Sequence, residues 1–66
     1  MIPPKIKPVI DLENQDGNAF AIIGAVRKAL KRAGADLEYI DKYKNEATSG
    51  DYDNLLQVTM KYIDFE

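Results

Sequence analysis

Hydrophobic residues recur at intervals of three and four along most of this chain, which is the spacing of one face of an α-helix. Over residues 19–33 the residues predicted to form the apolar face are Ala19, Ile22, Ile23, Val26, Leu30 and Ala33. Over residues 37–47 the predicted face consists of Leu37, Ile40, Tyr43 and Ala47. Over residues 52–63 it consists of Tyr52, Leu55, Leu56, Thr59, Met60 and Ile63. The pattern predicts three amphipathic helices, each with one face turned to a common core.

Residues that commonly begin or end helices stand at the boundaries of these segments. Asn18, Asp36 and Asp51 each precede a segment, and their side-chain oxygens can accept hydrogen bonds from the free N–H groups of a first helical turn. Gly34 follows the first segment, where a left-handed residue often ends a helix. The turns between segments are short, so neighbouring helices must pack directly against each other. We therefore predict an all-α fold, a compact three-helix bundle.

The start of the chain has a different character, because all three prolines lie within residues 1–8. Proline fixes φ, lacks an N–H donor and favours extended geometry in the residue before it. Residues 1–8 are thus predicted to form an extended, flexible Pro-rich arm, and residues 9–66 a single small helical domain.

Within residues 9–13, Ile10 and Leu12 fall on one side of an extended chain, and Asp11 and Glu13 fall on the other. This alternation predicts a short, half-buried extended segment. Such a segment could pair with the chain end near residues 63–65 or simply lie across the helices. A third possibility is that it adds a strand to another protein chain.

Composition excludes several kinds of chemistry. The chain of 66 residues has no cysteine and no histidine, which rules out disulfides, thiol catalysis, histidine bases and Cys/His zinc sites. A calcium loop starting at Asp51 would need Gly at its sixth position and Glu at its twelfth, where Leu56 and Tyr62 stand. We see no activated nucleophile and no glycine-rich phosphate loop. The chain is predicted to be non-enzymatic and to carry no cofactor or metal.

The net charge of −2 conceals an uneven distribution. Residues 1–34 hold six basic side chains against three acidic ones, whereas residues 35–66 hold three against eight. Four of the cations fall on the polar arc of the first helix: Arg27, Lys28, Lys31 and Arg32. Such a cluster can contact phosphates, so these residues are candidate nucleic-acid contacts. A solvated face matched to the helix dipole is the alternative interpretation.

A second set of candidates points to protein binding. Tyr39 and Val58 fall outside the apolar faces of their helices, and exposed Tyr and aliphatic side chains are favoured in interfaces. Val9, Ile10 and Leu12 of the extended segment are the further candidates. The leading hypothesis is a protein-protein interaction module that binds another protein or itself as a homodimer, and the alternative is a nucleic-acid-binding accessory protein.

The N-terminal residues and the apolar runs of the chain bear on its cellular location. The N-terminus has no apolar region typical of a signal peptide, and the longest apolar run is far below the roughly 20 residues that span a bilayer. We expect a cytoplasmic protein without membrane contact.

Two stretches carry a resemblance to a known family. The first is Asp11-Leu12-Glu13 followed by Asp16-Gly17-Asn18-Ala19-Phe20, and the second is Thr48-Ser49-Gly50-Asp51-Tyr52-Asp53 with Leu55-Leu56. Together they resemble a family of small bacterial and phage proteins of unassigned function, over roughly residues 11–62. The resemblance implies a microbial or phage cytoplasmic setting and transfers no site residue.

Overall fold

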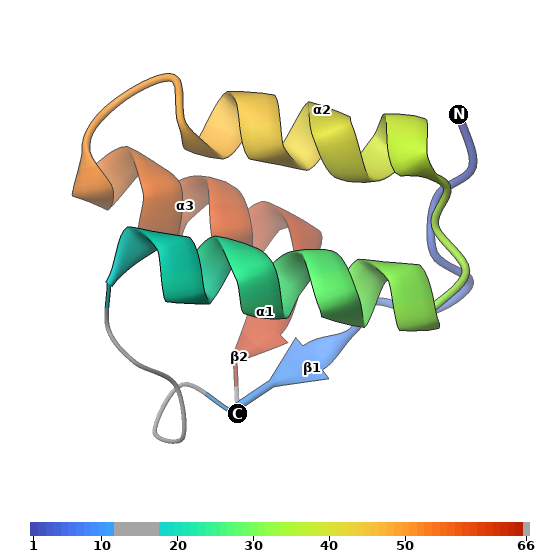
Figure 1. Ribbon diagram of the computed structural model, residues 1–66. Helices are drawn as coiled ribbons and strands as arrows, with labels where there is room; N and C mark the ends of the chain where they lie inside the picture. The colour runs from blue at the N-terminus through green and yellow to red at the C-terminus, as the bar shows by residue number, and fades with distance from the viewer. Residues whose placement is uncertain (12–17, 66) are drawn as a thin grey trace.

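Three helices and two short strands follow one another in the computed structural model, which describes residues 1–11 and 18–65 (Figure 1). The order is β1 (Val9–Ile10), α1 (Ala19–Arg32), α2 (Leu37–Ala47), α3 (Tyr52–Tyr62) and β2 (Asp64–Phe65). The predicted three-helix bundle with an extended N-terminal segment is confirmed, and each helix ends within one residue of its predicted boundary.

The predicted caps begin and end the helices. In each case an Asn or Asp side chain accepts a hydrogen bond from the backbone N–H three residues later. The pairs are Asn18 with Ala21 at 2.8 Å, Asp36 with Tyr39 at 2.9 Å and Asp51 with Asn54 at 3.0 Å. Gly34 has φ of 97°, the left-handed conformation expected after α1. Local sequence therefore sets where the helices start and stop.

The core lies where the three helices meet, and Tyr43, Ile22, Leu30, Ile63, Val26 and Thr59 are its largest fully buried side chains. One polar contact is enclosed within it. The hydroxyls of Tyr43 and Thr59 share a hydrogen bond of 2.8 Å, which joins α2 to α3. Because both hydroxyls are satisfied by each other, neither is left buried without a partner.

The buried face of α3 differs from the predicted one. Val58, predicted to lie outside the apolar face, is only 7% exposed, whereas Met60, predicted on that face, is half exposed. Tyr62, which also lies outside the predicted face, packs edge-on against both Tyr39 and Tyr43 with ring centroids 5.5 and 5.2 Å away. The buried face of α3 therefore has the spacing of a helix face next to the predicted one, which corrects the prediction for Val58; its residues are Leu55, Val58, Thr59 and Tyr62.

Leu37 and Tyr52 were also expected in the core, and both are exposed. Each is the first residue of its helix, at the margin of the bundle. The periodic pattern marks the inward direction along a helix but cannot show how far a neighbouring helix extends to cover its first turn.

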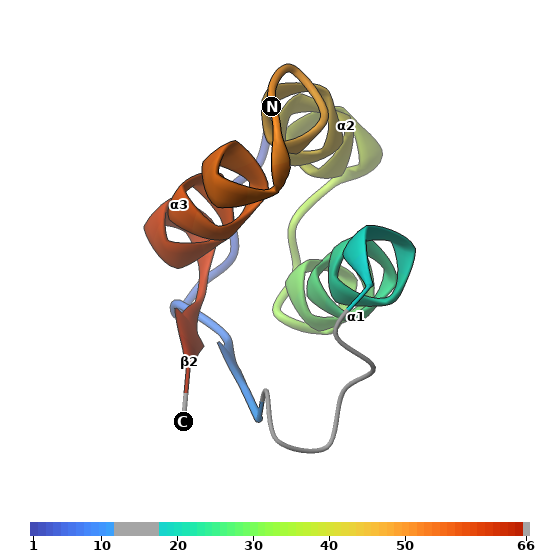
Figure 2. The ribbon, with the colours of Figure 1, turned by 90° about the vertical axis from the view of Figure 1, so that its left-hand side faces the viewer.

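The two strands close the bundle between α1 and α3. They form a parallel pair in which Val9 lies opposite Asp64 and Ile10 opposite Phe65. Figure 2 shows the three helices nearly end-on, with the strands beneath the opening between α1 and α3. Of the three possibilities predicted for residues 9–13, the structure shows pairing with the chain's own C-terminal end for Val9 and Ile10, while residues 12 and 13 lie outside the described ranges.

Candidate functional site

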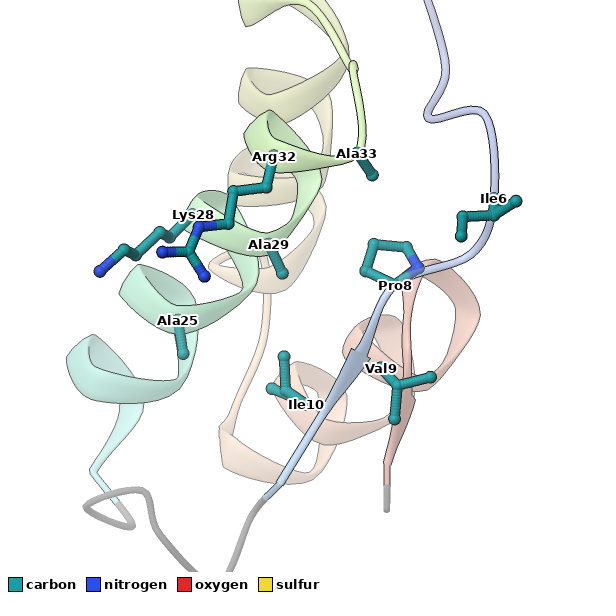
Figure 3. A pocket seen from close by; sticks show the side chains of 9 residues that line it. All are labelled: Ile6, Pro8, Val9, Ile10, Ala25, Lys28, Ala29, Arg32 and Ala33. Atoms are coloured by element: carbon teal, nitrogen blue, oxygen red, sulfur yellow. The ribbon is translucent and has the colours of Figure 1, made fainter.

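A groove of about 550 Å³ lies between α1 and the N-terminal segment (Figure 3). It is lined by Ile6, Pro8, Val9, Ile10, Ala25, Lys28, Ala29, Arg32 and Ala33. Seven of these nine residues are apolar. The groove is open to solvent, and its exposed lining combines these apolar side chains with polar surface that includes two cations.

The α1 wall of the groove is formed by Ala25, Ala29 and Ala33, which repeat every fourth residue and therefore share one face of the helix. Their methyl groups project toward the arm in Figure 3. Because alanine side chains are short, this face of α1 remains hollow where longer side chains would fill the space.

The opposite wall is the arm itself, which backbone contacts hold beside the helices. The Lys5 N–H donates to the Ala33 carbonyl at 3.0 Å, and the Asp64 N–H donates to the Pro8 carbonyl at 2.8 Å. The Lys7 ammonium also forms an ion pair with the Asp64 carboxylate at 3.1 Å. The arm is thus bound to α1 on one side and to β2 on the other. Figure 3 shows Ile10 pointing toward α1 and Val9 pointing away from it.

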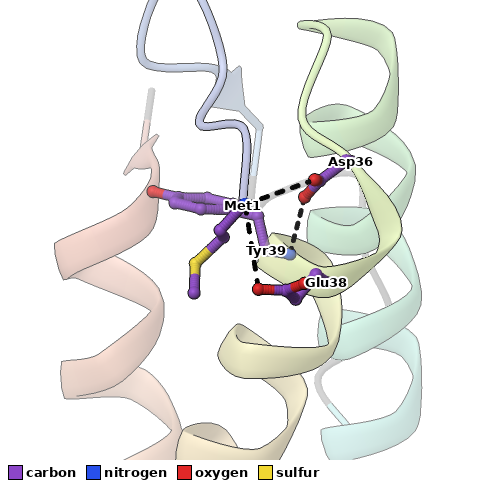
Figure 4. Close-up of polar contacts among 4 residues, drawn as sticks. All are labelled: Met1, Asp36, Glu38 and Tyr39. Atoms are coloured by element: carbon purple, nitrogen blue, oxygen red, sulfur yellow. Dashed lines mark hydrogen bonds and ion pairs between the residues drawn. The ribbon is translucent and has the colours of Figure 1, made fainter.

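The tip of the arm is held at the start of α2 (Figure 4). The Met1 ammonium lies 3.9 Å from the Asp36 carboxylate and 3.7 Å from that of Glu38. The Asp36 N–H also donates to the Ile2 carbonyl at 3.1 Å. Hydrogen bonds from the Tyr39 and Ile2 backbone groups, together with the Met1 ammonium, lower the pKa of Asp36 below its ordinary value of 3.8. One carboxylate therefore caps α2 and holds the arm.

The four cations of the predicted nucleic-acid face lie on one exposed arc of α1, about 140° wide at 100° per residue. Lys28 and Arg32 border the groove, on the side of α1 away from the arm in Figure 3. Arg27 and Lys31 continue the same arc outside the groove. All four are exposed, and none forms an ion pair with another residue in the described ranges.

The predicted protein-interface residues separate. Val9 and Ile10 line the groove together with Lys28 and Arg32, so the structure brings together two of the five predicted interface residues and two of the four predicted nucleic-acid contacts. Tyr39 is half-buried against Tyr62, on a different side of the molecule. Val58 is buried and cannot meet a partner. Leu12 lies outside the described residues.

A second, smaller hollow of about 290 Å³ lies at the opposite end of α1. It is lined by Ala19, Phe20, Ile23, Ala47, Thr48, Gly50, Asp51, Tyr52 and Leu55. Phe20 is 87% exposed beside it, an uncommon position for a large aromatic residue. The sequence shows Phe20 at the edge of the apolar face but gives no sign that α2 and α3 leave it uncovered.

The remaining strongly perturbed groups belong to the core. The Tyr62 hydroxyl donates a hydrogen bond to the Glu46 carboxylate, and burial together with this negative neighbour raises the pKa of Tyr62 well above its ordinary value. Burial also raises the pKa of Tyr43, against the smaller effect of its bond to Thr59. These groups join α2 to α3 and do not line either hollow.

Comparison with known proteins adds no identification. No family model matches the chain, and no curated protein or solved structure is similar to it. The resemblance to small bacterial and phage proteins therefore stays a prediction. Within residues 1–11 and 18–65, no helix has the length and apolar character needed to cross a membrane. Over the same residues, acidic side chains form no group of three that could hold a metal ion.

Proposed function

We propose that this protein is a non-enzymatic protein-interaction module and that the groove between α1 and the arm binds a short segment of a partner protein. The single observation that supports this function is the groove itself, an open hollow in which apolar side chains of α1 and the arm lie beside two cations. Apolar hollows with a few polar groups at the edge are typical of binding sites.

The small number of cations at the groove and the net negative charge favour a protein partner over nucleic acid. A nucleic-acid backbone presents a continuous row of phosphates and gains affinity from each cation that it meets. Here only Lys28 and Arg32 border the groove, and the whole chain has a net charge of −2. A short protein segment can use two cations and an apolar wall without approaching the acidic helices.

A peptide-display selection against the purified chain tests this function. Selected segments should bind the wild-type protein and lose binding to Ala29→Leu, because the larger side chain fills the α1 wall of the groove. Leu and Ala have similar helix propensities, so the variant should keep its fold. Ala21→Leu is the matched control, since Ala21 lies on α1 but lines neither hollow.

Selected segments that bind wild type and Ala29→Leu equally well would place binding elsewhere on the molecule and refute the proposed site. Circular dichroism and the melting temperature of both variants separate lost binding from lost folding.

A further inference from the structure

Within residues 1–11 and 18–65, Lys28 and Arg32 form no ion pair, and they lie beside seven apolar residues of the groove, a combination that restricts what can occupy it. Both side chains are exposed, and both line the groove together with the alanines of the α1 wall. A purely apolar segment would leave both charges without a partner. A segment with carboxylates on one side and apolar groups on the other would satisfy both features.

The layout across the groove has a definite order. Figure 3 shows the two cations on one side, the alanine face in the middle, and the arm with Pro8 and Ile10 on the other side. An extended peptide laid over the alanines would point alternate side chains to opposite sides. One set would reach the cations, and the other would reach the arm.

The spacing along the groove agrees with this arrangement. Lys28 and Arg32 are four residues apart, which is about 6 Å along a helix. Alternate residues of an extended chain are about 6.6 Å apart and lie on the same side. The alanine face from Ala25 to Ala33 extends about 12 Å, enough for about four extended residues.

We infer that the groove binds an extended segment of about four residues in which acidic and apolar side chains alternate, an inference that rests on the proposed function. The carboxylates pair with Lys28 and Arg32, and the apolar side chains pack against Pro8 and Ile10. The partner is thus a protein with an exposed acidic-apolar strand or tail.

The test is an NMR titration of the full ¹⁵N-labelled chain with blocked peptides at about 0.15 M salt, where charges more than about 8 Å apart are largely screened. The first peptide is Gly-Glu-Val-Glu-Val-Gly, and its uncharged control replaces both Glu with Gln. Two exposed ion pairs should make the Glu peptide bind about two- to thirtyfold more tightly. Its shifts should centre on the amides of Ala25, Ala29, Val9 and Ile10.

Two charge-reversed variants provide the sharpest comparison. K28E/R32E should lose the preference for the Glu peptide and gain one for a peptide with Lys in place of Glu. R27E/K31E changes the net charge by the same amount on the same helix and should keep the wild-type preference. If K28E/R32E loses its fold, K28Q/R32Q should still abolish the preference without reversing charge.

Equal binding of the Glu and Gln peptides within the groove would overturn the acidic preference and leave the proposed function standing. If both charge-reversed variants lost affinity for the Glu peptide equally, and the wild-type chain bound a single-stranded oligonucleotide, the acidic-apolar segment would be refuted in favour of a nucleic-acid face. Failure of the proposed function itself would be seen separately, as display-selected segments that ignore Ala29→Leu.

Discussion

Replacing Tyr43 with Phe removes one half of the buried hydrogen bond between α2 and α3. The Tyr43 and Thr59 side chains are both fully buried and their hydroxyls lie 2.8 Å apart, so water cannot replace the lost partner. A buried hydroxyl left without a partner costs about 1–3 kcal/mol. In a domain of this size, 1 kcal/mol shifts the melting temperature by about 4–8 °C. Tyr43→Phe is therefore expected to melt about 4–24 °C below wild type.

The matching change, Thr59→Val, should carry a similar cost because it leaves the Tyr43 hydroxyl unpaired. The double variant removes both polar atoms at once, and such paired removal can be nearly neutral. Urea unfolding followed by circular dichroism gives the free energy of unfolding of the wild type, the two single variants and the double variant, which together form a double-mutant cycle. The double variant should lose much less than the sum of the two single variants. Additive losses would refute the reasoning, because they would show that the two hydroxyls do not depend on each other.

Four further expectations follow from the structure. Gly24→Ala should raise the melting temperature by about 2–8 °C, since the exposed mid-helix glycine has negative φ and open space around its missing Cβ. Ile10→Ala should lower the free energy of unfolding by about 1–2 kcal/mol in urea unfolding, less than a full core truncation because Ile10 is half-buried. Since Asp36 has a lowered pKa, its carboxylate contributes fully to the free energy of unfolding above pH 3.8, and this contribution is lost as pH falls further. In acid titrations followed by circular dichroism, the free energy of unfolding of Asp36→Asn should therefore fall less steeply with pH than that of wild type. Since Tyr62 has a raised pKa, its neutral hydroxyl contributes fully to the free energy of unfolding below pH 10.0, and this contribution is lost as pH rises. In alkaline titrations, the free energy of unfolding of Tyr62→Phe should therefore fall less steeply with pH than that of wild type.

Most of the helical architecture could be predicted from local signals. Asn18, Asp36 and Asp51 cap the three helices, and Gly34 ends the first one, because these residues act on backbone groups only a few positions away. The same pattern placed the buried face of α1 correctly, since its buried residues are strongly apolar.

The error on α3 arose because two neighbouring faces of this helix both carry residues at helical spacing. The buried face includes Tyr62, whose partners Tyr39, Tyr43 and Glu46 lie on another helix, so the pattern within α3 does not choose between the two faces. Because Tyr62 faces inward, Val58 does as well, and the predicted interface of Tyr39 and Val58 was therefore wrong for Val58.

Only some of the residues that line the groove could be selected from the sequence. Sequence reasoning selected Lys28, Arg32, Val9 and Ile10, but assigned the cations to one candidate site and the arm to another. Their proximity depends on the parallel pairing of β1 with β2, a contact between the two ends of the chain. The alanine face between them was missed because short side chains on a helix produce no distinctive sequence signal.

The most direct test of the groove as a binding site is the set of intermolecular NOEs between the protein and the bound Gly-Glu-Val-Glu-Val-Gly peptide. We expect contacts from the peptide valine methyls to the side chains of Ala29, Pro8 and Ile10, which form its two walls. Contacts to the exposed rings of Phe20 and Tyr52 at the other hollow, in place of the groove, would contradict the assignment.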